Sequence, residues 1–120
     1  YKRQVWGSGT PMRELMFVED LSRAIVYLMG SINASDIYSM GISQINIGTG
    51  KDLSISELAQ IVKKVVGFDG VIEYDRSKPD GTPKKLLDVS RIHSLGWKHQ
   101  VEVEDGIAVT YKWFLENYKN

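Results

Sequence analysis

Apolar residues recur at helical spacing in three long stretches of this chain. The first stripe consists of Leu21, Ala24, Ile25, Leu28 and Met29. Intervals of three and four residues predict an amphipathic helix, because such positions lie on one helix face. Glu19 and Asp20 precede the stripe and suit the positive end of the helix dipole. Gly30 is expected to end this helix.

Two further stripes predict a second long helix and a last one. Ser54 and Glu57 match the capping box that opens many helices, and the apolar face after them consists of Leu58, Ile61, Val62 and Val65. Gly67 is expected to end this second helix. The last helix is expected to open at Glu104 and Asp105, and its stripe consists of Ile107, Tyr111, Phe114, Leu115 and Tyr118.

Extended segments are short and scattered between these helices. They are expected at residues 14–18, 44–47, 71–75 and 100–103. Residues 31–43 are polar and irregular and predict a loop, whereas residues 88–95 predict a short helix stopped by Gly96. No strand is expected before Trp6. Helices and strands are mixed along the chain, which indicates the α/β class.

The predicted strands are too few for the predicted helices. The first helix and the strand at residues 44–47 need a larger sheet to pack against. The chain also begins with Tyr1 rather than Met. We therefore expect a piece of a longer protein, in which elements within residues 14–50 pack on another domain.

The composition excludes several classes of protein. Lys and Arg number 15, as do Asp and Glu, so no overall field attracts nucleic acid or an anionic membrane. The sequence has no cysteine, which excludes disulfides, thiolate zinc sites and cysteine nucleophiles. It has no apolar run near the ~20 residues of a membrane span and no signal-peptide core at its start. We therefore expect a cytoplasmic location and neither nucleic-acid nor membrane partners.

The glycine clusters indicate turns rather than phosphate-binding loops. Residues 7–9 read Gly-Ser-Gly, but Met12 stands where a dinucleotide fingerprint needs its third glycine. Residues 48–50 fail in the same way at Leu53. Lys51 is followed by Asp rather than Ser or Thr, which excludes a P-loop.

Two other patterns are weak as catalytic motifs. Tyr74 and Lys78 have the Tyr-x-x-x-Lys spacing of short-chain dehydrogenases, but Pro79 disfavours a helix at the residue before it. In a strand these two positions lie about 13 Å apart, so the match is interpreted as accidental. His93 and His99 lack a metal-ligand spacing and receive no role.

Cations and an aromatic ring beside turns form a more specific pattern. Trp6 precedes the first glycine turn, and its ring can stack on a base. Arg13 follows that turn and can bind a phosphate through two hydrogen bonds. Asp80 lies in a Pro-Asp-Gly-Thr-Pro turn and can accept hydrogen bonds from a guanine edge or from sugar hydroxyls. Lys84 and Lys85 follow this turn. The alternative is that Trp6 belongs to the core and the cations form a solvated face.

Five segments resemble the GDP-L-fucose synthase family, a branch of the extended short-chain dehydrogenases. They read VWGSGTPMRE at residues 5–14, FVEDL at 17–21, INIGTG at 45–50, SKPDGTPKKLLDVSRIHSLGW at 77–97 and TYKWFLEN at 110–117. The segment at 77–97 is the most specific, whereas FVEDL and INIGTG recur across dehydrogenases that act on nucleotide sugars. The resemblance covers nearly all of the chain.

This resemblance implies an activity and a place in a whole enzyme. Family members convert GDP-4-keto-6-deoxy-D-mannose to GDP-L-fucose by 3,5-epimerisation and NADPH-dependent reduction at C4. Residues 1–120 would be the C-terminal GDP-sugar-binding region, with a helix and a strand that complete a missing N-terminal Rossmann domain. That domain would bind NADP and carry the catalytic Ser, Tyr, Lys, Cys and His. The chain alone would be inactive, and the whole enzyme would be a homodimer.

The family's substrate contacts would fall on Trp6, Arg13, Asp80 and Lys85. Trp6 would pack near the guanosine, and Asp80 would accept hydrogen bonds at the guanosine end. Arg13 and Lys85 would neutralise the diphosphate. Phe17 stands where the family often has His, which puts any helper role of that position in doubt.

Two other functions stay open. The chain could belong to another nucleotide-sugar epimerase, dehydratase or reductase, and comparing GDP with UDP and dTDP binding would separate these enzymes. It could instead be a non-catalytic nucleotide-sugar-binding module.

Overall fold

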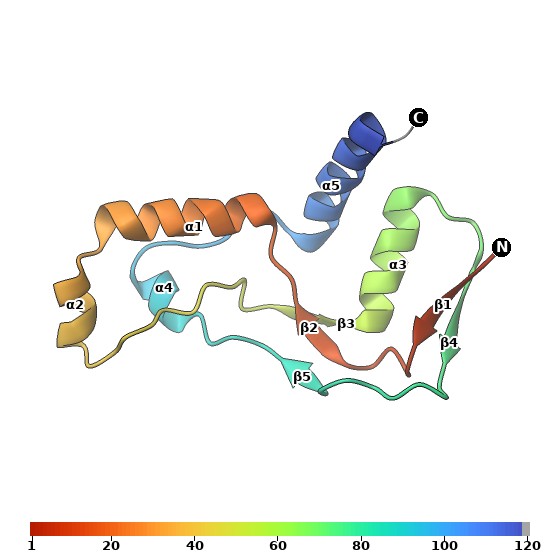
Figure 1. Cartoon of the computed structure of the whole chain (residues 1–120), viewed down its shortest axis with the longest axis horizontal. Coiled ribbons are helices and arrows are strands. Elements are labelled where there is room, and N and C mark those ends of the chain that lie inside the picture. Colours follow the sequence, from red (N-terminus) through yellow and green to blue (C-terminus); the bar gives the residue numbers. More distant parts are fainter. Residues whose placement is uncertain (119–120) are drawn as a thin grey trace.

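The computed structural model describes residues 1–118 of the chain, which form a thin plate of 56 × 35 × 18 Å (Figure 1). The Cα radius of gyration is 17.8 Å, well above the about 14 Å expected for a compact domain of this length. Few side chains are fully buried. The core cluster consists of Ala24, Val89, Ile92 and Trp97, so much of the apolar surface faces outward.

Helices and strands are mixed along the chain in the structure, which confirms the α/β class. The elements are β1 (Lys2–Trp6), β2 (Met12–Glu14), α1 (Val18–Ser31), α2 (Ala34–Ser39), β3 (Asp52–Ser54), α3 (Ile55–Val66), β4 (Val71–Asp75), β5 (Lys84–Lys85), α4 (Ser90–Ser94) and α5 (Val103–Tyr118). Within residues 1–118, no helix has the length and apolar character needed to cross a bilayer.

Two small sheets hold the N-terminal strands against the segment around residues 71–85. β1 runs parallel to β4, with Trp6 opposite Asp75. β2 is the middle strand of the other sheet, antiparallel to β3 and parallel to β5. Arg13 is the register partner of Lys85. Residues far apart in the sequence are thereby brought side by side, with β1 and β4 near the end of the plate that carries the N-terminus and β2 and β5 near its middle (Figure 1).

The helix α3 follows the sequence prediction closely. Ser54 Oγ accepts a hydrogen bond from the Glu57 N–H at 3.1 Å, and the Glu57 carboxylate accepts one from the Ser54 N–H at 2.7 Å. Gly67 ends the helix in the left-handed region, at φ 66°. The capping box and the stop are confirmed, because both depend on short-range contacts alone.

Two predictions in the first half of the chain are wrong. Gly30 does not end α1 but lies in its last turn, and the Ile32 N–H still bonds to the Leu28 carbonyl at 3.1 Å. The segment expected to be a loop contains α2, whose first turn is closed by Asp36 accepting from the Asn33 N–H at 3.1 Å. Asn33 and Asp36 are residues that favour helix starts, a signal that the polar composition of the segment obscured.

Several strand predictions are also wrong. The extended run at 14–18 is replaced by β2, which ends at Glu14, and by the start of α1. Residues 44–47 and 100–103 form no strand in the described part of the chain, and α5 already begins at Val103. A strand needs a neighbour for its backbone groups, and these segments have none. Conversely, β1 was not expected, because its polar residues gave no apolar alternation, yet it pairs with β4.

Candidate substrate-binding site

The turn after β1 is held by the carboxylate of Asp80. The Ser8 N–H donates to Asp80 Oδ1 at 2.8 Å, and the Ser8 hydroxyl donates to Asp80 Oδ2 at 2.7 Å. Gly7 and Gly9 have φ values of +83° and +78°, and a Cβ at position 7 would overlap the Asp80 carboxylate. The hydrogen bonds from Ser8 lower the pKa of Asp80, so its charge is firmly negative at neutral pH.

Trp6 lies at the end of β1, next to this turn, and 69% of its surface is exposed. The alternative that placed Trp6 in the core is therefore wrong. The ammonium group of Lys78 lies 5.5 Å from the centroid of the indole ring, within cation–π range. The ring is thus held at the surface, where it can stack on a planar ligand.

Arg13 and Lys85 form a pair of cations across the β2–β5 ladder. As register partners on parallel strands, their side chains leave the same face of the sheet. Arg13 Nη1 donates to the carbonyls of Met12 at 2.6 Å and Thr82 at 2.7 Å. Its Nη2 lies 3.0 Å from where a Cβ on Gly81 would stand. The guanidinium therefore reaches across to the loop that precedes Lys85.

The two adjacent lysines differ in their surroundings. Lys84 Nζ lies 3.3 Å from Asp52 Oδ2 on β3. Lys85 is exposed and has no ion pair within residues 1–118. Neighbouring strand residues point to opposite faces, so of the two lysines only Lys85 shares a face with Arg13.

The structure thus links the four residues through one loop between β4 and β5. Asp80 in this loop anchors the turn beside Trp6, and Arg13 contacts the loop at Gly81 and Thr82. Lys85 follows at the end of the loop. An aromatic face, a carboxylate and two cations on connected segments suit a ligand with a planar base and a diphosphate.

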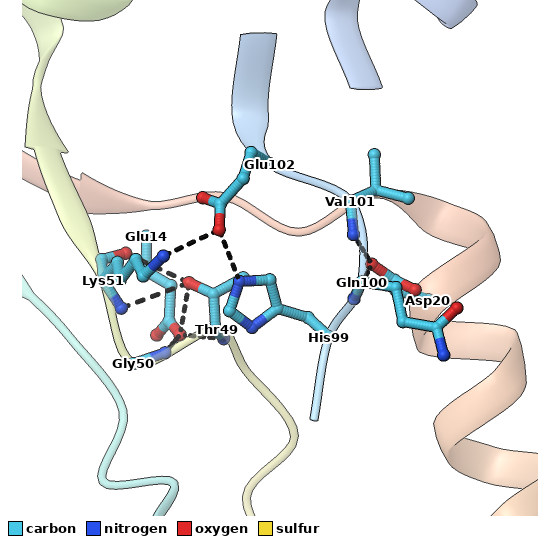
Figure 2. A network of polar contacts seen from close by, with 9 residues as sticks. All are labelled: Glu14, Asp20, Thr49, Gly50, Lys51, His99, Gln100, Val101 and Glu102. Atoms are coloured by element: carbon cyan, nitrogen blue, oxygen red, sulfur yellow. Dashed lines mark hydrogen bonds and ion pairs between the residues drawn. The ribbon is translucent and has the colours of Figure 1, made fainter. Parts of the chain in front are cut away.

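Glu14 is a residue of this region that sequence reasoning missed. Its Oε1 accepts from the N–H groups of Thr49 at 2.5 Å and Gly50 at 2.8 Å, and its Oε2 accepts from the Leu87 N–H at 2.9 Å. Figure 2 shows the Glu14 carboxylate against the turn at residues 48–50. Successive backbone N–H groups in such a turn form an anion-binding nest. The anion in this nest is the chain's own carboxylate.

Asp20 was expected only to suit a helix dipole, but it joins two distant segments. Its side chain is 1% exposed, and its Oδ2 accepts from the N–H groups of Gln100 at 3.0 Å and Val101 at 2.8 Å (Figure 2). Arg23 donates to Oδ1 at 3.1 Å. Burial raises the pKa of Asp20, but the bonds from Val101, Gln100 and Arg23 outweigh it and lower the pKa. These bonds satisfy the N–H groups of Gln100 and Val101 without a strand partner.

The residues of the two weak catalytic motifs are not arranged for catalysis in the structure. The Tyr74 hydroxyl bonds to Ser56 Oγ at 2.6 Å, whereas Lys78 lies over Trp6, so the Tyr-x-x-x-Lys match is accidental. His99 Nε2 lies 3.5 Å from the Glu102 carboxylate. Residues 1–118 contain no group of three or more metal-ligating side chains.

A groove of about 660 Å³ lies away from this site, between the start of α1, α3 and α5. Its walls are mainly apolar and include Leu58, Val62 and Phe114. A diphosphate would find no cation among these lining residues. The groove therefore lacks the charged groups that bind a diphosphate.

Comparison with known proteins agrees with the resemblance seen in the sequence. Residues 2–48 match the model of the NAD dependent epimerase/dehydratase family. GDP-L-fucose synthase of Escherichia coli K12 is 52% identical over 94% of this chain and 36% of its own length. Probable GDP-L-fucose synthase 1 of Oryza sativa is 49% identical over 94% of this chain and 32% of its own length.

Solved structures give the same result. The crystal structure of a GDP-6-OMe-4-keto-L-xylo-heptose reductase from Campylobacter jejuni has a TM-score of 0.89 and 42% identity, over 96% of this chain and 34% of that one. The chain thus spans about a third of the length of the relatives it matches. With relatives of about 50% identity along almost its whole length, the chain belongs to the GDP-L-fucose synthase family of NAD-dependent epimerase/dehydratase proteins.

Proposed function

We propose that this chain is the substrate-binding part of a GDP-L-fucose synthase. The whole enzyme would convert GDP-4-keto-6-deoxy-D-mannose to GDP-L-fucose by 3,5-epimerisation and NADPH-dependent 4-reduction. The observation that carries the proposal is the Arg13–Lys85 pair on one face of the β2–β5 ladder, joined through one loop to the exposed ring of Trp6. Two of the relatives bear this activity in their names.

Each site residue has a role in binding GDP. The base stacks on Trp6, worth about 1–3 kcal/mol. Arg13 and Lys85 bind the diphosphate, and each charged hydrogen bond contributes about 1.5–3 kcal/mol. Asp80 holds the turn beside Trp6 and accepts hydrogen bonds at the guanosine end through its remaining lone pairs. The chain would orient the sugar for reaction but not catalyse it.

NADP is assigned to the rest of the enzyme. The glycine turns of this chain do not fit a dinucleotide, because Asp80 fills the space beside Gly7 and Glu14 occupies the nest at residues 48–50. Solved structures of two relatives, the GDP-mannoheptose C4 reductase MlghC from Campylobacter jejuni and a GDP-L-fucose synthetase from Naegleria fowleri, contain NADP. NADP would supply the hydride for the reduction. We expect no NADPH oxidation by the 120-residue chain alone.

The remaining part of the enzyme would be a Rossmann domain covering the outer face of α1. Ala24 faces the core, but the opposite side of the helix is apolar and exposed at Val18, Leu21, Ile25 and Met29. A helix that is apolar on both sides is suited to lie between two layers. Elements within residues 14–50 would pack on this domain, and the whole enzyme would be a homodimer.

A second candidate is a reductase of another GDP-sugar. Two solved relatives at 42% identity are named as GDP-heptose reductases. The same base and diphosphate contacts serve both candidates, so the sugar distinguishes them. Competing GDP-4-keto-6-deoxy-mannose against a GDP-4-keto-heptose in the complete enzyme would decide between them.

The proposal is tested by titrating the chain with GDP and recording two-dimensional amide NMR spectra. We expect dispersed peaks, with shifts at the Trp6 indole and at Arg13 and Lys85. UDP and dTDP should shift the same peaks only at higher concentration. Dispersed peaks whose positions do not change on addition of GDP would contradict the proposed site.

A further inference from the structure

We propose that Glu14 is a positioning residue that fixes the Lys85 segment beside Arg13. The inference rests on the proposed function in so far as the two cations share one diphosphate. The placement of the Lys85 segment itself can be measured without any ligand.

The segment that carries Lys85 has little burial to hold it. Every residue from 78 to 88 is exposed. β5 comprises only two residues and pairs with β2 at two register positions. So short a ladder is weak without further contacts. The position of Lys85 therefore depends on polar contacts to neighbouring segments.

Such contacts lie on both sides of β5. Before it, the Met12 N–H bonds to the Pro83 carbonyl at 2.8 Å, and Arg13 Nη1 bonds to the Thr82 carbonyl at 2.7 Å. After it, the Leu87 N–H donates to Glu14 Oε2 at 2.9 Å. Glu14 thus extends the β2–β5 contact beyond the ladder, two residues past Lys85.

Glu14 is itself held from the opposite side. Its Oε1 sits in the nest formed by the Thr49 and Gly50 N–H groups, with Gly50 at φ +74°. A Cβ at Gly48 would overlap this oxygen, so the close approach needs glycine there. One carboxylate therefore joins three segments, which are β2, the turn at 48–50 and the segment after β5 at Leu87.

This arrangement requires a carboxylate rather than an amide. Both oxygens of Glu14 face N–H donors. Glutamine has the same size, but one side of its amide is itself a donor. In Glu14→Gln, an NH₂ group must face either Leu87 or the nest, and one contact is lost.

The first test measures amide hydrogen exchange in the chain without ligand. We expect Glu14→Gln to accelerate exchange at Lys85 and Leu87 about tenfold, in line with the loss of one charged hydrogen bond. Exchange at Ile61 in α3 should stay unchanged. Glu116→Gln, the same change on exposed α5, is the matched control. Unchanged exchange at Leu87 in Glu14→Gln would overturn the proposal.

A second variant covers the case in which Glu14→Gln does not fold. Gly48→Ala leaves the carboxylate chemically unchanged but places a Cβ that would overlap Glu14 Oε1 and lie 3.1 Å from Val89 Cγ1. It should also accelerate exchange at Leu87, and a larger effect at Leu87 than at Val89 would assign the change to Glu14. Slow exchange at Leu87 in a folded Gly48→Ala variant would count against the role of Glu14.

The third measurement is a double-mutant cycle on GDP affinity. If Glu14 acts through Lys85, Glu14→Gln should lower the affinity for GDP about fivefold in the parent chain. In the Lys85→Ala background the same change should lower it less than about twofold. Equal factors in both backgrounds would show a general structural effect and overturn the proposal. Absent GDP binding by the parent chain would instead reject the proposed function, and the exchange data would still decide the role of Glu14.

Discussion

Ser8 donates two hydrogen bonds to Asp80, one from its backbone N–H to Oδ1 and one from its hydroxyl to Oδ2, and so joins the turn after β1 to the loop after β4. Both carboxylate oxygens are therefore engaged by Ser8. The first effect of Asp80 is therefore to support the turn beside Trp6. Its contact with guanosine stays a prediction.

The first prediction concerns the pKa of Asp80. Removing the hydroxyl in Ser8→Ala leaves only the backbone donor, so the pKa should rise towards its usual value. A carboxyl-detected NMR titration measures the change, and Ser39→Ala, in α2, is the control. An unchanged pKa in Ser8→Ala would show that the hydroxyl does not act on Asp80.

The sign of the pH effect follows from the same shift. Because folding lowers the pKa of Asp80, its ionised form stabilises the folded turn above the unfolded pKa. This contribution is lost as pH falls through the lowered pKa of the folded state. In acid, the peaks of Ser8 and Trp6 should therefore shift together with the titration of Asp80.

The second prediction separates backbone strain from steric overlap at Gly7. Both Gly7 and Gly41 have positive φ, at +83° and +70°, so alanine costs each about 1–2 kcal/mol. Only at Gly7 would the new Cβ overlap Asp80, whereas nothing lies within 4 Å at Gly41. Urea denaturation should show Gly7→Ala as clearly the less stable variant. Equal urea midpoints of Gly7→Ala and Gly41→Ala would mean that the Asp80 side chain moves away from the new Cβ at little energetic cost.

The third prediction tests the assignment of Lys85 against its neighbour. Lys85→Ala should lower the affinity of the chain for GDP by roughly 10- to 150-fold, which corresponds to the loss of one charged hydrogen bond. Lys84→Ala removes the same charge from a side chain that faces Asp52 and should cost less than about threefold. Calorimetric titration with GDP measures both. If the two variants lose affinity equally, the effect is one of net charge and the phosphate contact is misassigned.

The fourth prediction concerns the buried carboxylate of Asp20. In Asp20→Asn, an oxygen can still accept from Gln100 and Val101, but the NH₂ group then faces the Arg23 guanidinium. The mismatch should lower the free energy of unfolding by about 1–3 kcal/mol. Asp69→Asn, in the exposed loop before β4, should change it little. Urea denaturation at neutral pH compares the two variants.

Acid should weaken the same contact in the parent chain. The pKa of Asp20 is lowered on folding, so its contribution to stability is present above the unfolded pKa and is lost as pH falls through the folded one. The difference between the parent chain and Asp20→Asn should therefore shrink in acid. A constant difference would contradict the role of the charge.

The sequence by itself determined the elements whose signals are local. The capping box at Ser54 and Glu57, the stop at Gly67 and the strand at 71–75 all lie within short windows, and the structure agrees. The α/β class and the family also followed from the sequence. The four site residues were named by resemblance, and their contact with a ligand awaits measurement.

Only the tertiary structure decided which distant segments meet. β1 became a strand because β4 lies beside it, while residues 44–47 lack such a neighbour and pack Ile45 and Ile47 on the core instead. The pairing of Arg13 with Lys85 depends on a register that no local pattern encodes. The roles of Glu14 and Asp20 depend on N–H groups contributed by remote loops. In a single sequence, a polar residue with such a long-range partner cannot be told apart from any other polar residue.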